Sequence, residues 1–339
     1  MSARTVLGVA LLTLTLAIGR AQAAPPVEAP IAIAIHGGAG TIERAALGPD
    51  QRKAIEVDLA RALEAGHSIL REGGSSLDAV TAAVVVLEDS PYFNAGKGAV
   101  FNADGRIDLD AAVMVGSQQR AGAVAALTRV RNPVLAARAV MEQSPHVFMI
   151  GAGAQRFARE QGLAMVSPSY FRTEARWQQY LSARQRGREA TALVPGVNPR
   201  PYGTVGAVAV DRQGEVAAAT STGGMTMKRY GRVGDVPVIG AGTWAEPGCA
   251  VSATGWGEFF IRSNAAHEIC ARVRLAGTPM PEAASQVVEG AIPRLGGDGG
   301  VIAIDAQGNI AMPYSSAGMY RGRISVDGAR SIAIWAEGE

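Results

Sequence analysis

The chain has 339 residues, which is enough for one large domain or two small ones, and 48% of them are hydrophobic, which supports a sizeable buried core. The formal net charge is only +2 and its arginines are spread along the chain, so nothing indicates a polyanionic partner such as nucleic acid. The four histidines (His36, His67, His146 and His267) are scattered and form no zinc-type spacing, which is more typical of structural positions than of metal ligands.

The first 23 residues have the pattern of a secretory signal peptide. Arg4 supplies the positive charge, residues 6–18 are mostly apolar, and Ala21-Gln22-Ala23 fits a small-x-small cleavage site. The apolar run is short for a membrane anchor. We therefore predict export to the periplasm or the medium, a mature chain that starts near Ala24, and no membrane association after cleavage.

Before residue 203, hydrophobic periodicity and turn residues predict alternating strands and helices. Ser75 or Ser76 caps one helix, Asn132-Pro133 opens another, and the NADG sequence at 102–105 is a hairpin signal. The expected strands are 31–35, 100–101 with 107–109, segments of 111–130, and 147–150. The expected helices are 50–71, 76–88, one from 133, 151–160 and 174–190, the last passing into a flexible linker over about 184–203.

After residue 203, the expected elements suggest two layers of sheet. A hairpin over 205–210 and 216–222 precedes strands at 238–243 and 249–253, helices at 257–275 and 281–291, and a hairpin over 301–304 and 309–313. The strands are mostly apolar on both faces, which is typical of sheets buried between layers. Two stacked sheets with helices outside fit this pattern, although the pattern alone also allows a doubly wound sheet.

The chain has two cysteines, Cys249 and Cys270. In an exported protein such a pair can form a disulfide. Cys249 lies where a loop meets the expected strand at 249–253 and Cys270 inside an expected helix, so the spacing leaves the pairing open.

The stretch from Gly203 to Asp235 gathers residues suited to nucleophilic catalysis. The strands at 205–210 and 216–222 form a hairpin by pattern, so Thr204 at its entry and Thr222 at its exit should lie side by side. A polar, arginine-rich segment ends abruptly at the Gly203–Thr204 bond. A threonine becomes a strong nucleophile when it is the first residue of a chain, because its own α-amino group then serves as the base. Arg232 and Asp235 follow closely and could hold a zwitterion.

Seven sequence motifs, in order over nearly the whole chain after residue 30, resemble the plant-type L-asparaginase/isoaspartyl peptidase family of N-terminal-nucleophile hydrolases. They are HGGAG at 36–40, LEDSPYFNAGKGAVFN at 87–102, GTVGAV at 203–208, TSTGGMT at 220–226, GRVGD at 231–235, SATGWGE at 252–258 and LGGDGG at 295–300.

The resemblance implies an α+β fold, the four-layer αββα sandwich of that superfamily, built from an α subunit of residues 24–203 and a β subunit of residues 204–339. It implies a threonine-type amidohydrolase that cleaves itself between Gly203 and Thr204. The freed Thr204 then hydrolyses β-aspartyl peptide bonds and the side-chain amide of L-asparagine.

The resemblance also assigns roles around Thr204. Thr222 orients the nucleophile, Arg232 binds the substrate α-carboxylate and Asp235 its α-ammonium group, while the Thr254 hydroxyl and the Gly255 N–H form an oxyanion hole. Trp256 replaces a small or hydroxyl residue common in relatives, which leaves the leaving-group preference open. The expected substrate contacts are Arg232, Val233, Gly234, Asp235, Thr254, Gly255, Trp256 and Gly257.

No cofactor is expected for the chemistry. The resemblance implies a structural sodium ion held by the main-chain oxygens of Leu87, Glu88, Ser90, Phe93, Ala95 and Lys97. It further implies small-molecule substrates, no nucleic acid, and assembly as a dimer of cleaved αβ heterodimers.

Three alternative functions differ from this interpretation. A glycosylasparaginase would share the fold and the nucleophile. An esterase would use Ser221, which lies in an approximate nucleophile elbow, but a glycine pair rather than a helix follows that serine. A non-enzymatic exported amino-acid-binding protein would neither cleave itself nor release ammonia.

Overall fold

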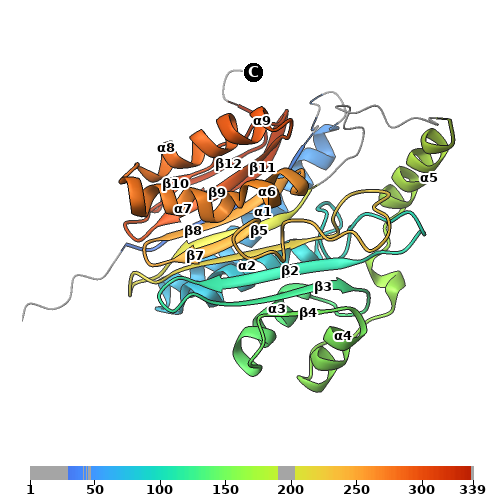
Figure 1. The fold of residues 1–339 in the computed structure, drawn as a ribbon, viewed down its shortest axis with the longest axis horizontal. Coiled ribbons are helices and arrows are strands. Elements are labelled where there is room, and N and C mark those ends of the chain that lie inside the picture. Colours follow the sequence, from blue (N-terminus) through green and yellow to red (C-terminus); the bar gives the residue numbers. More distant parts are fainter. Residues whose placement is uncertain (1–29, 41, 43, 45–46, 190–202, 337–339) are drawn as a thin grey trace, which may run out of the picture.

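The computed structural model describes residues 30–40, 42, 44, 47–189 and 203–336. In this part of the chain two sheets lie face to face, with helices on their outer faces (Figure 1). The larger sheet has the strand order β12-β11-β1-β5-β6-β2-β3-β4 and the smaller one the order β10-β9-β8-β7. Neighbouring strands are antiparallel except β3 and β4, which are parallel.

The elements have the following bounds. The larger sheet contains β1 (Ala32–Gly40), β2 (Leu109–Val115), β3 (Arg120–Leu127), β4 (Phe148–Ile150), β5 (Val205–Val210), β6 (Val216–Thr222), β11 (Gly318–Ile324) and β12 (Arg330–Ala333). The smaller sheet contains β7 (Thr243–Glu246), β8 (Cys249–Gly255), β9 (Gly299–Asp305) and β10 (Ile310–Ala311). The helices are α1 (Pro49–Arg71), α2 (Ser76–Asp89), α3 (Pro133–Gln143), α4 (Gly151–Glu160), the 3₁₀ turn η2 (Pro168–Phe171), α5 (Glu174–Glu189), α6 (Gly257–Ser263), α7 (Ala265–Ala276), α8 (Met280–Ser285), the π-helical turn η3 (Gln286–Ala291) and α9 (Ile292–Arg294).

Three apolar layers hold these elements together, and β5 shows how. Ala207 and Ala209 pack in the core that contains residues of α1, α2 and α3, whereas Val208 and Val210 pack between the two sheets. Side chains alternate across a strand, so a strand buried on both faces needs apolar residues at successive positions. A third core lies between the smaller sheet and helices α7 and α8. The predicted αββα sandwich is thus confirmed, and the doubly wound sheet is excluded.

Local signals located several helices correctly. The Ser75 hydroxyl accepts the Asp78 N–H at 3.1 Å and so caps α2. Pro133 occupies the first turn of α3, as expected. Helix α5 continues to Glu189, so the first residues of the expected linker, 184–189, are helical. The expected signal peptide and linker residues 190–202 lie outside the described residues.

Three predicted elements differ from the structure because local hydrogen bonds or backbone angles favour a turn at these positions. At 102–105 the Asn102 side chain accepts the N–H groups of Asp104 and Arg106, which forms a turn, but the flanking residues 100–101 and 107–108 are not strands. Residues 238–242 turn back onto the Asp235 carbonyl, and the strand begins only at Thr243. The helix expected over 257–275 breaks at Asn264, whose φ is 48°.

The HGGAG sequence is part of β1 rather than a loop. The strand extends past the expected end at Ile35 to Gly40 because β11 pairs with it as far as Gly40, whereas the pairing with β5 ends at His36. A bulge between His36 and Gly38 interrupts the pairing, and Gly38 adopts a φ of 115° that favours glycine. This bulge brings β1 against the Gly203–Thr204 bond.

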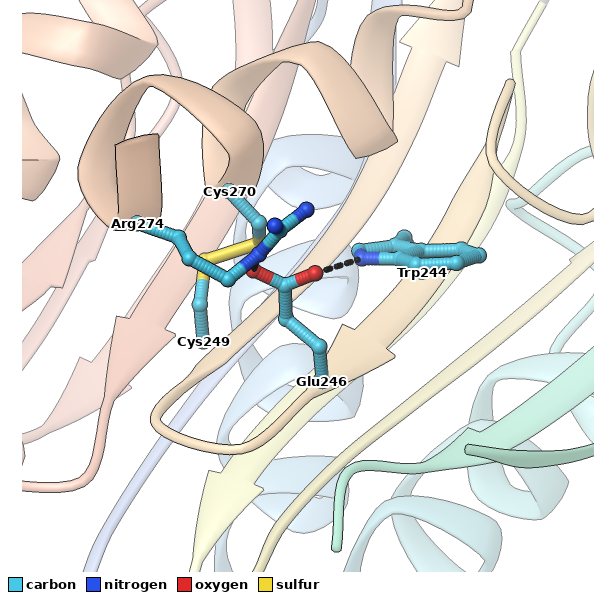
Figure 2. The surroundings of a disulfide bond; sticks show 5 residues. All are labelled: Trp244, Glu246, Cys249, Cys270 and Arg274. Atoms are coloured by element: carbon cyan, nitrogen blue, oxygen red, sulfur yellow. Dashed lines mark hydrogen bonds and ion pairs between the residues drawn. A yellow bond between two sulfur atoms is a disulfide. The ribbon is translucent and has the colours of Figure 1, made fainter. Parts of the chain in front are cut away.

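A disulfide joins Cys249 at the start of β8 to Cys270 in α7, with the Cα atoms 5.8 Å apart (Figure 2). The neighbouring Glu246 side chain is buried and accepts hydrogen bonds from Trp244 Nε1 at 3.2 Å and Arg274 Nε at 3.0 Å. These contacts hold α7 against the smaller sheet, and the disulfide answers the question of pairing that the spacing left open.

Among the helices that the structure describes, none combines the length and hydrophobicity needed to span a membrane.

Candidate active site

The β5–β6 hairpin brings the two predicted hydroxyls together. Val205 pairs with Ser221, so Thr204 and Thr222 lie at the same end of the hairpin. The Thr204 Oγ donates to the Thr222 Oγ at 3.1 Å, and both residues are buried. The two threonine hydroxyls are therefore in direct contact, as the hairpin pattern predicted.

The carbonyl oxygen of Gly203 is held by two donors. It accepts the Thr222 hydroxyl at 2.9 Å and the Asn94 side-chain amide at 2.8 Å. The same amide group donates to the Gly224 carbonyl at 2.7 Å, while the Asn94 oxygen accepts the Val100 N–H at 2.9 Å. The sequence suggested only a cation site in the loop around Asn94, and the contact with Gly203 was not predicted. The one local hint is that Asn94 lies close to Gly96 and Gly98 in the sequence.

His36 fixes the other carbonyl of the pair, that of Thr204. Its Nδ1 lies 3.0 Å from this oxygen, which can only accept, so Nδ1 carries the proton and Nε2 accepts from the Ser252 hydroxyl at 2.9 Å. Burial lowers the pKa of His36 to about 3, against the opposing effect of the Thr204 hydrogen bond. The Ser252 oxygen lies 2.8 Å from the Thr220 hydroxyl, which extends the buried network to β6. His36 thus anchors the backbone at Thr204, in keeping with the structural role expected for it.

Arg232 and Asp235 line a small cavity next to Thr204. The Asp235 carboxyl is buried and its Oδ2 has no hydrogen-bond partner among the described residues. Burial raises the pKa of Asp235 to about 7, despite the nearby Arg232 guanidinium. A buried carboxyl with a free oxygen is suited to an incoming cation, which is the role predicted for it.

The Arg232 guanidinium has a partner that sequence reasoning missed. Its Nε and Nη2 donate to the two carboxylate oxygens of Glu258 at 2.9 and 2.8 Å. This bidentate pair occupies one edge of the planar guanidinium, so the N–H groups that remain for a further acceptor are those at Nη1 and Nη2. Gly234 gives that side room, because an added Cβ there would lie 2.8 Å from Arg232 Nη1.

The remaining predicted residues divide into two groups. Gly234 and Gly255 line the cavity with Thr204 and Thr222, whereas Val233, Thr254, Trp256 and Gly257 are not among the described residues that line it. The Thr254 hydroxyl accepts the Ala39 N–H at 3.1 Å, and an added Cβ at Gly257 would lie 2.6 Å from Asp235 Oδ1. The Trp256 ring packs edge-on against Phe259, with centroids 4.9 Å apart.

Gly203 separates this cavity from a larger one. The cavity at Arg232 and Asp235 measures about 10 Å³, which is close to the minimum for a single water molecule. A second cavity of about 340 Å³ lies against β1, and Gly203 lines both. Gly203 therefore occupies space beside Thr204, between the two cavities.

A family model described as asparaginase matches residues 29–334 of this chain. The chain belongs to the asparaginase family. Relatives of this family member include a protein named isoaspartyl peptidase from Salmonella typhimurium, 52% identical over 292 residues that cover 85% of this chain and 93% of the relative. The isoaspartyl peptidase of Escherichia coli is 52% identical over 294 residues (85% and 91%), and a plant-type L-asparaginase of Pyrococcus abyssi is 41% identical over 295 residues (85% and 94%).

The loop expected to hold sodium in this asparaginase-family chain is folded tightly on itself. The Leu87 carbonyl accepts the Ser90 N–H at 3.3 Å, and the Glu88 carbonyl accepts the Lys97 N–H at 2.7 Å. The Phe93 carbonyl, by contrast, faces Gly98, where an added Cβ would lie 2.8 Å away. No group of three or more His, Cys, Asp or Glu side chains suited to a metal occurs among the described residues. The main-chain sodium site stays a prediction, while the loop's visible effect is to deliver Asn94 to Gly203.

The surroundings of Ser221 argue against the esterase interpretation. Its hydroxyl points to the opposite face of β6 from Thr220 and Thr222 and donates to Glu88 Oε1 at 2.6 Å. Burial raises the pKa of Glu88 to about 8. Ser221 is fully buried and has no histidine contact among its described hydrogen bonds, so it lacks both the base and the access that an esterase nucleophile needs.

Proposed function

We propose that this protein is a self-cleaving isoaspartyl peptidase that also hydrolyses L-asparagine. The observation that carries the proposal is the contact chain from the Thr204 hydroxyl to the Thr222 hydroxyl and on to the Gly203 carbonyl. Family membership and the isoaspartyl peptidase relatives support it, because the family match covers residues 29–334 and the relatives align with 85% of the chain.

Self-cleavage begins when Thr204 Oγ attacks the Gly203 carbonyl carbon. The Thr204 proton passes to Thr222 while Thr222 gives its own proton to the Gly203 oxygen, and the negative charge that develops on this oxygen during the attack is stabilised by the Thr222 hydroxyl and the Asn94 amide. The C–N bond then breaks, its nitrogen takes up the proton, and the acyl group moves to Oγ as an ester. Water hydrolyses this ester, which leaves a carboxylate on Gly203 and a free α-amino group on Thr204.

In substrate hydrolysis the freed α-amino group is the base for the same hydroxyl. Its reference pKa is about 8, so a fair fraction is neutral at pH 7. The substrate's aspartyl α-carboxylate binds Arg232 on the edge that Glu258 leaves free, and its α-ammonium group binds Asp235, near the Gly257 backbone. Thr204 attacks the side-chain carbonyl, and the Thr254 hydroxyl and Gly255 N–H stabilise the oxyanion. The C–N bond breaks and the amine, or ammonia from L-asparagine, leaves with the proton held by the α-amino group. Water then hydrolyses the ester on Thr204 and releases aspartate.

The N-terminal pattern and the disulfide both support export to the periplasm or the medium, since disulfides persist in oxidising compartments. Within this proposal the mature protein is a dimer of cleaved αβ heterodimers, formed from residues 24–203 and 204–339. Sedimentation of the purified protein measures that assembly.

The test of the function is the fate of the Gly203–Thr204 bond. Purified wild-type protein should migrate as two fragments, and Edman degradation of the β fragment should begin Thr-Val-Gly-Ala-Val. Thr204→Ala should remain one folded, inactive chain, whereas Thr204→Ser, the matched control, keeps a hydroxyl and should still cleave. An uncut wild-type protein that hydrolyses asparagine at full rate would show that Thr204 is not the nucleophile. Release of N-acetylglucosamine from its asparagine conjugate, in preference to cleavage of β-aspartyl dipeptides, would instead indicate a glycosylasparaginase.

A further inference from the structure

The cavity of about 340 Å³ on the far side of Gly203, called here the Arg176 cavity, is large enough for an amino-acid side chain. Its walls come from β1, from the loop that carries Asn94, and from the start of α5. Apolar groups of Ile42, Ile55, Pro91 and Tyr320 line it. Arg176 is the only charged side chain among its described lining residues.

Arg176 is a cation without an anionic partner among the described residues. Its Nε donates to the Gly98 carbonyl at 2.7 Å, its Nη1 to the Gln179 side chain at 3.0 Å, and its Nη2 to the Tyr92 carbonyl at 3.4 Å. All three acceptors are neutral. A guanidinium has five N–H groups, so two lack an acceptor in the described protein. Burial lowers the pKa of Arg176, and no carboxylate offsets this effect.

The position of the cavity relates it to the bond that reacts. Gly203 and Asn94 line the Arg176 cavity, and Gly203 also lines the small cavity that holds Arg232 and Asp235. When Gly203 moves away from Thr204 after the proposed cleavage, the two cavities that it lines become one space on both sides of the Thr204 hydroxyl. One side then offers groups for an aspartyl zwitterion, and the other offers a cavity of mixed polar and apolar lining with one cation that has no anionic partner among the described residues.

We propose that the Arg176 cavity is the leaving-group subsite and that Arg176 binds the free α-carboxylate of the residue attached to the β-aspartyl group. This assignment rests on the proposed function. A β-aspartyl dipeptide releases an amino acid that carries a carboxylate, whereas L-asparagine releases ammonia, which carries none. The preferred substrates are thus β-aspartyl dipeptides with a free C-terminus. A carboxylate could also come from Gly203 itself after cleavage, so the experiment separates these two sources.

The test compares β-aspartyl-leucine with β-aspartyl-leucinamide on fully cleaved enzyme. We expect wild-type kcat/KM to favour the free acid by about tenfold or more, the range for a hydrogen bond between charged groups. Arg176→Met should bring the ratio close to one, and Arg176→Lys should give an intermediate ratio. Arg172→Met is the matched control: Arg172 is exposed, stacks over Trp177 at 4.1 Å and is not among the described lining residues, so the wild-type ratio should persist.

The ratio of kcat/KM for the free acid to that for the amide distinguishes carboxylate binding by Arg176 from a purely structural role of this residue. Arg176 also holds the Gly98 and Tyr92 carbonyls, so its loss can disturb the loop, but such a disturbance lowers both substrates' rates alike. A high ratio that survives Arg176→Met would overturn the assignment. A wild-type kcat/KM ratio near one would also overturn it. If removal of Gly203 from the α subunit by a carboxypeptidase then raised this ratio, the partner of Arg176 would be the Gly203 carboxylate. Cleaved wild-type enzyme that hydrolyses neither β-aspartyl substrate nor asparagine would refute the proposed function itself.

Discussion

Replacing Asn94 by alanine should slow self-cleavage strongly without abolishing it. The Asn94 amide is one of two donors to the Gly203 oxygen, on which negative charge develops when Thr204 attacks. The other donor, the Thr222 hydroxyl, is retained in the variant. The contact is 2.8 Å long and buried, so water cannot readily replace it.

The size of the effect follows from the loss of one preorganised oxyanion donor, which typically costs about 10²–10³ in rate, or about 3–4 kcal/mol of transition-state stabilisation. The substitution also leaves the Val100 N–H and the Gly224 carbonyl without their Asn94 partner. Each buried unpaired group costs about 1–3 kcal/mol of folding free energy. A second variant must therefore separate slower chemistry from poorer folding.

Asn102→Ala provides that control. Asn102 is buried in the same loop region and its side chain bonds the backbone at Asp104 and Arg106, but no described hydrogen bond joins it to Gly203. Precursor made by cell-free translation would be sampled over time on denaturing gels, and the first-order cleavage constant compared among wild type and both variants, with circular dichroism to verify folding. Folded Asn94→Ala that cleaves at the wild-type rate would refute the assigned donor role.

Four further outcomes are expected. Arg232→Ala should still self-cleave but lose about 2–5 kcal/mol of transition-state binding for β-aspartyl dipeptides, and an unchanged kcat/KM would contradict its role. The KM for substrate should rise as the pH falls through about 7, because protonation removes the charge by which Asp235 binds ammonium; a KM constant from pH 8 to pH 6 would oppose this. Replacing Cys249 and Cys270 together by alanine should lower the free energy of unfolding by about 2–4 kcal/mol, measured by urea denaturation, and an unchanged midpoint would argue against a stabilising bridge. EDTA should leave activity essentially intact, and loss of activity that zinc restores would overturn a metal-free chemistry.

Signals that act over a few residues were readable from the sequence. The hairpin that places Thr204 beside Thr222 follows from two apolar runs and a turn, and both strands lie where the pattern put them. The period of α1 and the Ser75 cap of α2 likewise depend on neighbours within a turn or two. The apolar character of both faces of β5 already indicated burial between layers.

The contacts that complete the site depend on packing between distant segments. Asn94 reaches Gly203 across 109 residues of sequence, and His36 reaches Ser252 across 216, because the bulged end of β1 and the loop after α2 meet at the open end of the β5–β6 hairpin. Strands β11 and β12 were not predicted, because their mixed burial gives no clear alternation and their positions depend on pairing, of β11 with β1 and of β12 with β11. Sequence alone thus determined which residues could react, through local hydrogen bonding and periodicity. The packing of the two sheets and their helices decided which hydrogen-bond donors surround these residues. The positions of donors such as Asn94 and His36 are set by hydrophobic cores that form only when the whole chain folds.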